Sequence, residues 1–395
     1  MQVPTRRKSF SLLWVITCSA ITLPITCDAV GDFVKVTTRD AVTVLTTPAG
    51  EQSSNAISFE NAQFMTLPTV KPSLKAIDTS RQASIRPGYS LGHIGSGHTN
   101  RITLPMSTRS YGSTSYLQQS NINVVVPSDF GTSNNPFTTA RADLGDLVTN
   151  LAYPYRASGK LFFIKDNATY LCSAALIEPG IAVTAAHCVT GYGKRTFYGS
   201  FTFIPGYRAG EAPFGKWGAS QVYVPSDYFN GTGCANGVVC KNDVAVIVLA
   251  PGANPTYPGT DTGWYGYAWD GYGFAGKKTQ ITQIGYPGCL DDGELMERND
   301  AYGVKTASKK NNTLIGSLMC EGASGGPWVI NFGLPPTLTN TTPGIRSTPN
   351  LVVGVTSWGY EKSTPKQMGA SPFTSSNILD LMNKACSGTN ADRCN

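Results

Sequence analysis

Residues 320–328 of this 395-residue sequence read CEGASGGPW and place one serine, Ser324, among small residues. The glycines allow the backbone to bend, so that the N–H groups of Gly322 and Ser324 can point toward the same place. Two converging amide donors beside a hydroxyl suit acyl transfer, because the tetrahedral intermediate concentrates its charge on one oxygen. The stretch therefore predicts a serine nucleophile with an oxyanion hole formed by these two N–H groups.

A serine hydroxyl is a weak nucleophile until a base and an orienting carboxylate activate it. Residues 183–188 read VTAAHC and offer His187, which is the one histidine after residue 98. Residues 241–249 read KNDVAVIVL and place Asp243 at the start of an apolar strand. A buried carboxylate needs hydrogen-bond donors, so it can hold a neighbouring imidazolium. The sequence thus predicts His187 as the base and Asp243 as its partner.

These three motifs, in the order His, Asp, Ser, resemble those of a chymotrypsin-fold serine protease. The chain is most similar to the secreted glutamyl-endopeptidase-type branch through residues 148–157 (VTNLAYPYRA), 262–267 (TGWYGY) and 284–288 (IGYPG). The similarity runs from about residue 145 to the C-terminal end. It implies an endopeptidase that acts on proteins or peptides through an acyl-enzyme intermediate.

The same resemblance implies a set of substrate-binding residues: Leu318, Met319, Thr356, Ser357, Trp358 and Gly359. Leu318 stands at the base of the expected specificity pocket, where trypsin-like members carry a carboxylate. Thr356 stands where glutamyl endopeptidases carry a histidine. We therefore expect neither basic nor strictly glutamyl specificity, but an apolar pocket, unless Leu318 and Met319 are simply core residues.

Ser357 resembles the family serine that hydrogen-bonds the catalytic aspartate. Ala323 replaces the aspartate that some members use for activation, so activation must proceed differently here.

The chain divides into three parts. Residues 1–29 resemble a signal peptide, with a basic start, an apolar stretch to residue 25 and small residues before position 30, although an uncleaved membrane anchor is the alternative. Residues 30–141 contain no cysteine and many polar residues, which predicts a propeptide or a flexible extension that is never removed. Residues 142–395 form the expected protease domain. Arg141 is the basic residue nearest this boundary.

From residue 153 onward, short runs of strand-forming residues alternate with turns, which predicts an all-β barrel or sandwich. Residues 376–386 are the one stretch with a convincing helical pattern. With the resemblance, the expected fold is two antiparallel six-stranded β-barrels with a C-terminal helix, preceded by a poorly structured N-terminal segment. Within that segment, residues 42–46 and 121–126 are candidate strands.

The cysteines favour an oxidised, exported protein. Loss of Cys18 and Cys27 with the signal leaves eight of the ten, an even number that can pair completely. Cys172 and Cys188 resemble the disulfide that closes the histidine loop in the family. The remaining cysteines suggest two short loops and one longer pairing that stays open: Cys234 with Cys240, Cys386 with Cys394, and Cys289 with Cys320. The spacing does not favour a zinc site.

Only 14% of residues are charged and the net charge is +6, which gives no indication of nucleic-acid binding. We expect a secreted monomer that needs no cofactor or metal and leaves the membrane once its signal is removed. A catalytically silent, protease-like binding module is the alternative from another class. An α/β-hydrolase is disfavoured because His187 precedes the serine and no helix follows it.

Overall fold

The computed structural model describes residues 35–39, 41–47, 57–70, 87–105, 137–143, 148–232, 242–252, 256–274, 278–305, 313–333, 347–360 and 366–395. The expected signal peptide (1–29) and the candidate strand at 121–126 lie outside these ranges, as do Cys234 and Cys240.

Six antiparallel strands form the first barrel. They are β8 (Ser158–Lys165), β9 (Ala168–Glu178), β10 (Ile181–Thr184), β11 (Gly199–Pro205), β13 (Trp217–Pro225) and β14 (Ala245–Leu249). Their order is β13-β11-β8-β9-β10-β14, and pairing of β13 with β14 closes the sheet. Closure leaves none of these strands as a free edge. The inward faces are rich in Val, Ile, Leu and Phe, which favour the pleated and buried surface of a strand.

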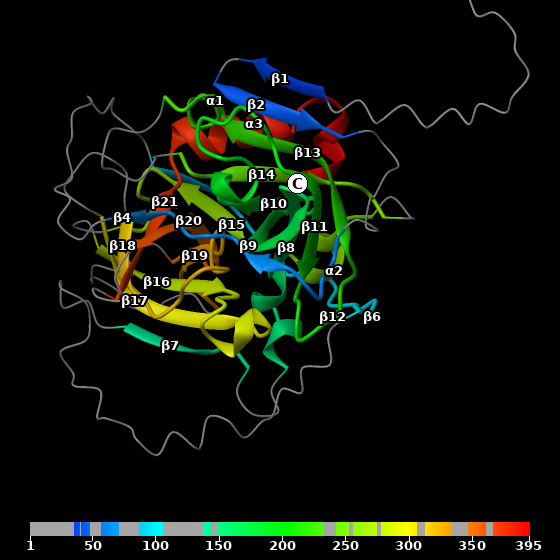
Figure 1. The fold of residues 1–395 in the computed structure, drawn as a ribbon. Helices are drawn as coiled ribbons and strands as arrows, with labels where there is room; N and C mark the ends of the chain where they lie inside the picture. Colours follow the sequence, from blue (N-terminus) through cyan, green and yellow to red (C-terminus); the bar gives the residue numbers. More distant parts are fainter. Residues whose placement is uncertain are drawn as a thin grey trace, which may run out of the picture. The chain divides into compact units, whose positions relative to one another are not determined.

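A second closed barrel follows in the chain. Its strands are β16 (Lys278–Gly285), β17 (Glu297–Lys305), β18 (Thr313–Gly316), β19 (Pro327–Ile330), β20 (Leu351–Tyr360) and β21 (Gln367–Pro372). The order β19-β16-β17-β18-β21-β20 is closed by pairing of β19 with β20. The predicted pair of six-stranded antiparallel barrels is therefore confirmed (Figure 1).

The described parts of residues 30–141 are more regular than the sequence predicted. They contribute β1 (Lys35–Arg39), β2 (Val42–Thr46), β3 (Gln63–Phe64), β4 (Thr69–Val70), β5 (Gly88–Ser90), β6 (Ile102–Thr103) and β7 (Phe137–Arg141). Strand β2 coincides with the candidate strand at 42–46 and pairs with β13, while β7 pairs with β17. Both additions extend a barrel sheet. Their stability comes from partners far away in the sequence, which local composition does not reveal.

Shorter elements complete the described chain. Strand β12 (Glu211–Ala212) pairs with β6, and β15 (Gly266–Trp269) pairs with β5 and β20. The α-helices are α1 (Ser226–Asn230), α2 (Pro258–Thr262) and α3 (Asp380–Ala385). A π-helical turn at Ser375–Leu379 leads into α3, so the predicted C-terminal helix at 376–386 is present. Single 3-10 turns occupy Thr149–Leu151, Tyr155–Ala157, Ala186–Cys188, Asp291–Gly293 and Gly388–Arg393.

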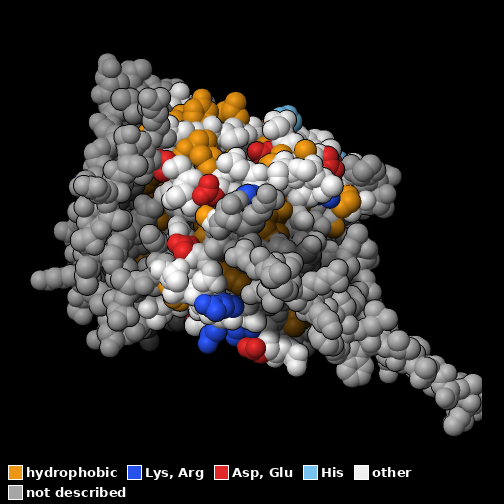
Figure 2. Space-filling model, turned by 90° about the horizontal axis from the view of Figure 1, so that it is seen from above, with side chains coloured by type: hydrophobic (Ala, Val, Ile, Leu, Met, Phe, Trp, Pro, Cys, Tyr) orange, Lys and Arg blue, Asp and Glu red, His pale blue; other side chains and the backbone are white. Residues whose placement is uncertain are grey.

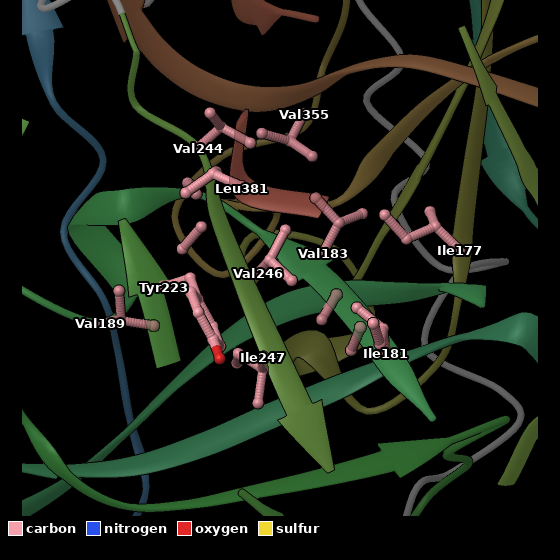
Figure 3. Packing of buried hydrophobic residues seen from close by; sticks show 14 of the residues in the cluster. Ile177, Ile181, Val183, Val189, Tyr223, Val244, Val246, Ile247, Val355 and Leu381 are labelled. Carbon is pink, nitrogen blue, oxygen red and sulfur yellow. The ribbon is translucent and has the colours of Figure 1, made fainter. Parts of the chain in front are cut away.

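The main hydrophobic core fills the first barrel and continues toward the second. Figure 3 shows Val183 and Val246 of the first barrel near Leu381 of α3 and Val355 of β20, with Ile247 farther along β14 in the same cluster. Each is almost fully buried, and burying such a side chain contributes about 1.5–3 kcal/mol. Direct packing of Val355 into this cluster ties β20 to β10, which ends just before His187, and to β14, which begins just after Asp243.

The surface carries few charges. On the face in Figure 2, acidic side chains are scattered singly among uncharged atoms, and one group of basic side chains lies near an edge. Within the described ranges, no helix is both long and apolar enough to span a membrane.

Candidate active site

Strand pairing brings His187 and Asp243 together. Strand β10 pairs with β14 antiparallel, with Thr184 opposite Ala245. Because the strands run in opposite directions, the residues just after β10 and just before β14 meet at the same end of the ladder. His187 lies in the 3-10 turn that follows β10, and Asp243 lies two residues before β14. A disulfide from Cys188 to Cys172 of β9 fixes this turn to the sheet.

Both oxygens of Asp243 accept hydrogen bonds from His187. The backbone N–H of His187 lies 2.8 Å from Oδ1, and the imidazole Nδ1 lies 2.8 Å from Oδ2. The hydroxyl of Ser357 also donates to Oδ2, at 2.6 Å. The carboxylate is only 1% exposed, so these donors replace the water that it loses. Because a carboxylate only accepts, Nδ1 acts as the donor toward Asp243, and Nε2 is the ring nitrogen that remains available to another partner.

Two tyrosines lie near the same carboxylate. Burial raises the pKa of the Tyr228 phenol well above its usual value, and the negative charge of Asp243 raises it further. Burial also raises the pKa of Tyr198 to about 12, with smaller contributions from Asp166 and Asp243. Both phenols therefore stay neutral beside Asp243.

Ser324 lies on the tight turn between β18 and β19, held against β9. The N–H of Ser173 donates to the carbonyl of Ser324 at 2.7 Å, and the Ser173 hydroxyl donates to the carbonyl of Gly322 at 2.8 Å. Gly325 has φ of +78°, and a Cβ there would lie 2.0 Å from Thr184 Oγ1. Only glycine combines this backbone conformation with so close an approach to β10. The glycines of the motif thus seat the serine beside the histidine strand.

Four polar groups of these motifs have no hydrogen-bond partner in the described part of the chain. The Oγ of Ser324 and the Nε2 of His187 are both buried and make no hydrogen bond to a described residue. The N–H groups of Gly322 and Ser324 likewise donate to no described residue. Buried polar groups are normally satisfied, so unpaired ones point to a functional role. A hydroxyl, a base nitrogen and two amide donors are the groups that acyl transfer requires.

The expected pocket residues divide into two environments. Leu318 is 41% exposed, whereas Met319 is buried in the core of the second barrel. Thr356 is fully buried, and its hydroxyl accepts hydrogen bonds from Gln283 Nε2 at 3.0 Å and Trp328 Nε1 at 2.9 Å. The Thr356 side chain therefore faces the barrel interior. Trp358 and Gly359 continue along β20 beyond Ser357.

Three of the four expected disulfides lie in the described residues. The structure pairs Cys172 with Cys188, Cys289 with Cys320, and Cys386 with Cys394. The Cys289–Cys320 disulfide links the loop after β16 to the segment that leads to Ser324, because Cys320 lies four residues before that serine. Although His187 lies close to Cys172 and Cys188, these sulfurs are in a disulfide. Because the thiolate is the form that binds metal, these three residues do not provide a zinc site.

Sequence reasoning missed several residues that shape this site. Ser173 supports the serine turn, and Gln283 and Trp328 hold the Thr356 hydroxyl. Phe64, from the N-terminal region, lies against the backbone of Gly322. The position of Ser173 directly after Cys172 was one available signal. Nothing local marks Phe64, because its contact depends on chain folding back over more than two hundred residues.

Comparison with known proteins gives consistent matches. The trypsin family profile matches residues 149–379. A glutamyl endopeptidase of Bacillus licheniformis is 26% identical over 163 residues, which is 41% of this chain and 46% of that protein. An extracellular metalloprotease of Bacillus subtilis is 28% identical over 123 residues, which is 31% of this chain and 36% of that protein. The chain therefore spans less than half the length of these two relatives.

Two solved structures resemble the fold. The protease Anisep from Arthrobacter nicotinovorans is 24% identical, with a TM-score of 0.47, and the match covers 59% of this chain and 96% of that one. A Glu endopeptidase in complex with MPD is 21% identical, with a TM-score of 0.45, and the match covers 66% and 99%. The family profile extends over more than half of this chain and includes all three of His187, Asp243 and Ser324. The chain belongs to the trypsin family.

Proposed function

We propose that this protein is a serine endopeptidase that cleaves proteins or peptides with a triad of Ser324, His187 and Asp243. The observation that carries the proposal is the doubly bonded His187–Asp243 pair, whose free Nε2 is buried and unpaired, as is the Oγ of Ser324. The family match and the resemblance to glutamyl endopeptidases support it.

In this mechanism the Oγ of Ser324 attacks the scissile carbonyl while Nε2 of His187 takes its proton. The N–H groups of Gly322 and Ser324 stabilise the oxyanion. As the C–N bond breaks, Nε2 returns the proton to the leaving amine, and an acyl-enzyme remains on Ser324. Water then attacks this ester with His187 again acting as the base. Asp243 stays ionised and holds the imidazolium through its bond to Nδ1.

The preference of the pocket is proposed to be apolar. Met319 is buried among hydrophobic residues, and the Thr356 hydroxyl already accepts bonds from Gln283 and Trp328. Neither Met319 nor Thr356 offers a cationic partner to a substrate carboxylate, and burying a carboxylate without one costs several kcal/mol. A peptide-library digest should therefore show cuts after apolar residues. Cuts mainly after Glu would show that another residue supplies a donor.

We also propose that the protein is made as a secreted preproenzyme, with the signal ending at residue 29 and the propeptide ending at residue 141. Arg141 is the last residue of β7, and its guanidinium bonds Asp291 at 2.5 and 2.6 Å. A cut after Arg141 therefore requires β7 to separate from β17. Intact-mass analysis of secreted protein should find a species that begins at Ala142 and has no titratable thiol. A fully active species that begins near residue 30 would show that this region is permanent.

Substitution of the triad tests the activity itself. Casein hydrolysis by secreted protein should fall by several orders of magnitude in Ser324→Ala and in His187→Ala. Ser387→Ala, an exposed serine after α3, is the matched control and should retain full activity. Mature, folded wild-type protein that neither cleaves casein nor reacts with a fluorophosphonate would support the silent binding module instead.

A further inference from the structure

Residues 63–70, which we call the strap, run from the first barrel to the second. Strand β3, at the start of the strap, pairs parallel with β9 through Gln63 and Phe64. Strand β4, at its end, pairs parallel with β20, with Thr69 opposite Gly359. Figure 1 shows β4 at the edge of the second barrel. The strap therefore bridges β9 of the first barrel and β20 of the second, the strands that contain Ser173 and Ser357.

Two backbone hydrogen bonds fix the strap beside the triad. The N–H of Met65 donates to the carbonyl of Leu171 at 3.0 Å, and the N–H of Gly359 donates to the carbonyl of Pro68 at 3.0 Å. Leu171 lies two residues before Ser173, which holds the Ser324 carbonyl. Gly359 lies two residues after Ser357, which holds the Asp243 carboxylate. The strap thus bonds the same strand segments that support the nucleophile and the orienting acid.

Side chains of the strap fill the space next to these groups. Leu67 is only 7% exposed and packs in the cluster that contains Met319 and Met368. A Cβ on Gly359 would lie 2.8 Å from Leu67 Cδ2, so this side chain contacts the residues of the expected specificity pocket. Phe64 lies on the other side, where a Cβ on Gly322 would come within 2.7 Å of its ring. Phe64 therefore borders one of the two proposed oxyanion donors.

The burial of the reactive atoms fits a covered site. Ser324 is 0% exposed and His187 is 4% exposed, and both Oγ and Nε2 expose less than 1 Å². A nucleophile that attacks a peptide must be reached by that peptide, so the described conformation cannot be the one that admits substrate. The strap contacts both flanks of this site, and its Met65 and Leu67 are buried there.

We propose that the strap is an intramolecular inhibitor that occupies the substrate groove in the direction opposite to a substrate. The proposal rests on the proposed protease activity. The specificity pocket takes the side chain on the N-terminal side of the cut. A substrate must therefore run from the Gly359 side toward the Leu171 side. The strap runs the other way, with Met65 at Leu171 and Pro68 at Gly359.

This reversal explains how a peptide can lie in the groove without being cut. If Ser324 attacked a strap carbonyl, the leaving amine would lie on the pocket side rather than the side where His187 delivers its proton to a substrate. The strap also presents an aliphatic side chain, Leu67, to the pocket. The groove should therefore bind peptides that carry a branched aliphatic residue at this position.

The test measures how fast Ser324 reacts with a small fluorophosphonate in the full-length, uncut chain, with the intact mass checked in each sample. Leu67→Asp places a charge in the apolar contact and should release the strap, which raises the labelling rate by about tenfold or more. Leu91→Asp, an equally polar change at a 60% exposed leucine of the same region, should leave the rate unchanged. Phe64→Ala leaves the buried Met65 and Leu67 unchanged and should also raise the labelling rate. This second variant keeps the test decisive if Leu67→Asp does not fold.

A second arm adds a synthetic peptide of residues 57–70 to full-length Leu67→Asp protein. The peptide should slow labelling competitively and remain uncut, whereas a scrambled peptide of the same composition should not inhibit. Equal labelling rates in wild type, Leu67→Asp and Phe64→Ala would contradict the inhibitory role of the strap but not the proposed protease activity. Rapid cleavage of the peptide would have the same meaning. Absence of labelling in every folded variant would overturn the proposed activity and the strap with it.

Discussion

His187 donates hydrogen bonds from its backbone N–H and from its imidazole Nδ1 to the two oxygens of Asp243, both at 2.8 Å. One bond fixes the turn that carries the histidine, and the other fixes the ring. Together they set the rotation of the imidazole and keep the proton on Nδ1. The free nitrogen, Nε2, is then the one that can accept a proton from Ser324.

Asp243→Asn should abolish most of the activity while leaving the fold intact. An amide side chain has the same shape but can donate to Nδ1, which favours the wrong tautomer of His187. The kcat for a peptide substrate should fall by about 10⁴-fold. Asp166→Asn is the matched control, because its side chain is 82% exposed. A loss of less than tenfold in Asp243→Asn would contradict the proposed role.

Ser173→Ala should impair both stability and catalysis. The Ser173 hydroxyl accepts from the N–H of Tyr286 at 2.9 Å and donates to the carbonyl of Gly322 at 2.8 Å. Its removal leaves two buried backbone groups without this partner, at a cost of about 1–3 kcal/mol each. Because Gly322 carries a proposed oxyanion donor, kcat should fall more than KM rises. Lower stability in urea unfolding with an unchanged kcat would show that Ser173 has only a structural role.

Gly325→Ala should be far more destabilising than Gly333→Ala. Both glycines have positive φ, +78° and +87°, so alanine is strained at either position. At Gly325 the added Cβ would also meet Thr184 Oγ1 at 2.0 Å, whereas at Gly333 nothing lies within 4 Å. Strain alone costs about 1–3 kcal/mol, and overpacking adds a similar amount. Equal free energies of unfolding for the two variants would contradict this packing of the serine turn against β10.

The Glu178→Gln variant should gain stability relative to wild type as the pH rises. Burial raises the pKa of Glu178 to about 7, although the N–H of Asn395 donates to its carboxylate. The pKa of this carboxyl in the unfolded chain is near 4.5. Between pH 4.5 and about pH 7 the folded state therefore binds more protons than the unfolded state, and stability falls as pH rises. The advantage of Glu178→Gln in unfolding free energy should therefore grow by about 1–3 kcal/mol between about pH 5 and pH 8. Glu60→Gln, at an exposed position, should show no such trend.

The sequence predicted the barrels because strong local signals mark their strands, and signals of the same kind mark the residues of the candidate triad. Apolar strands bounded by turns mark β10 and β14, and their antiparallel register alone explains why His187 meets Asp243. The glycines around Ser324 mark the tight turn. Ser357 was also expected beside Asp243, and its hydroxyl lies 2.6 Å from the carboxylate.

The N-terminal strands could not be predicted in the same way. Strands β3 and β4 contain two residues each, which is too short for any periodic pattern. Their partners lie in β9 and β20, more than one hundred residues away. The environment of Thr356 was equally hidden, because the donors Gln283 and Trp328 come from two other strands of the barrel.

The most direct test of the account is to map the fluorophosphonate adduct on secreted protein by mass spectrometry. The proposed triad predicts a single adduct, on the Oγ of Ser324, which is lost in Ser324→Ala. Its rate of formation should fall at least about a hundredfold in His187→Ala, because the base that takes the serine proton is gone. An adduct on another residue, or equal labelling of Ser324 with and without His187, would contradict the central claim.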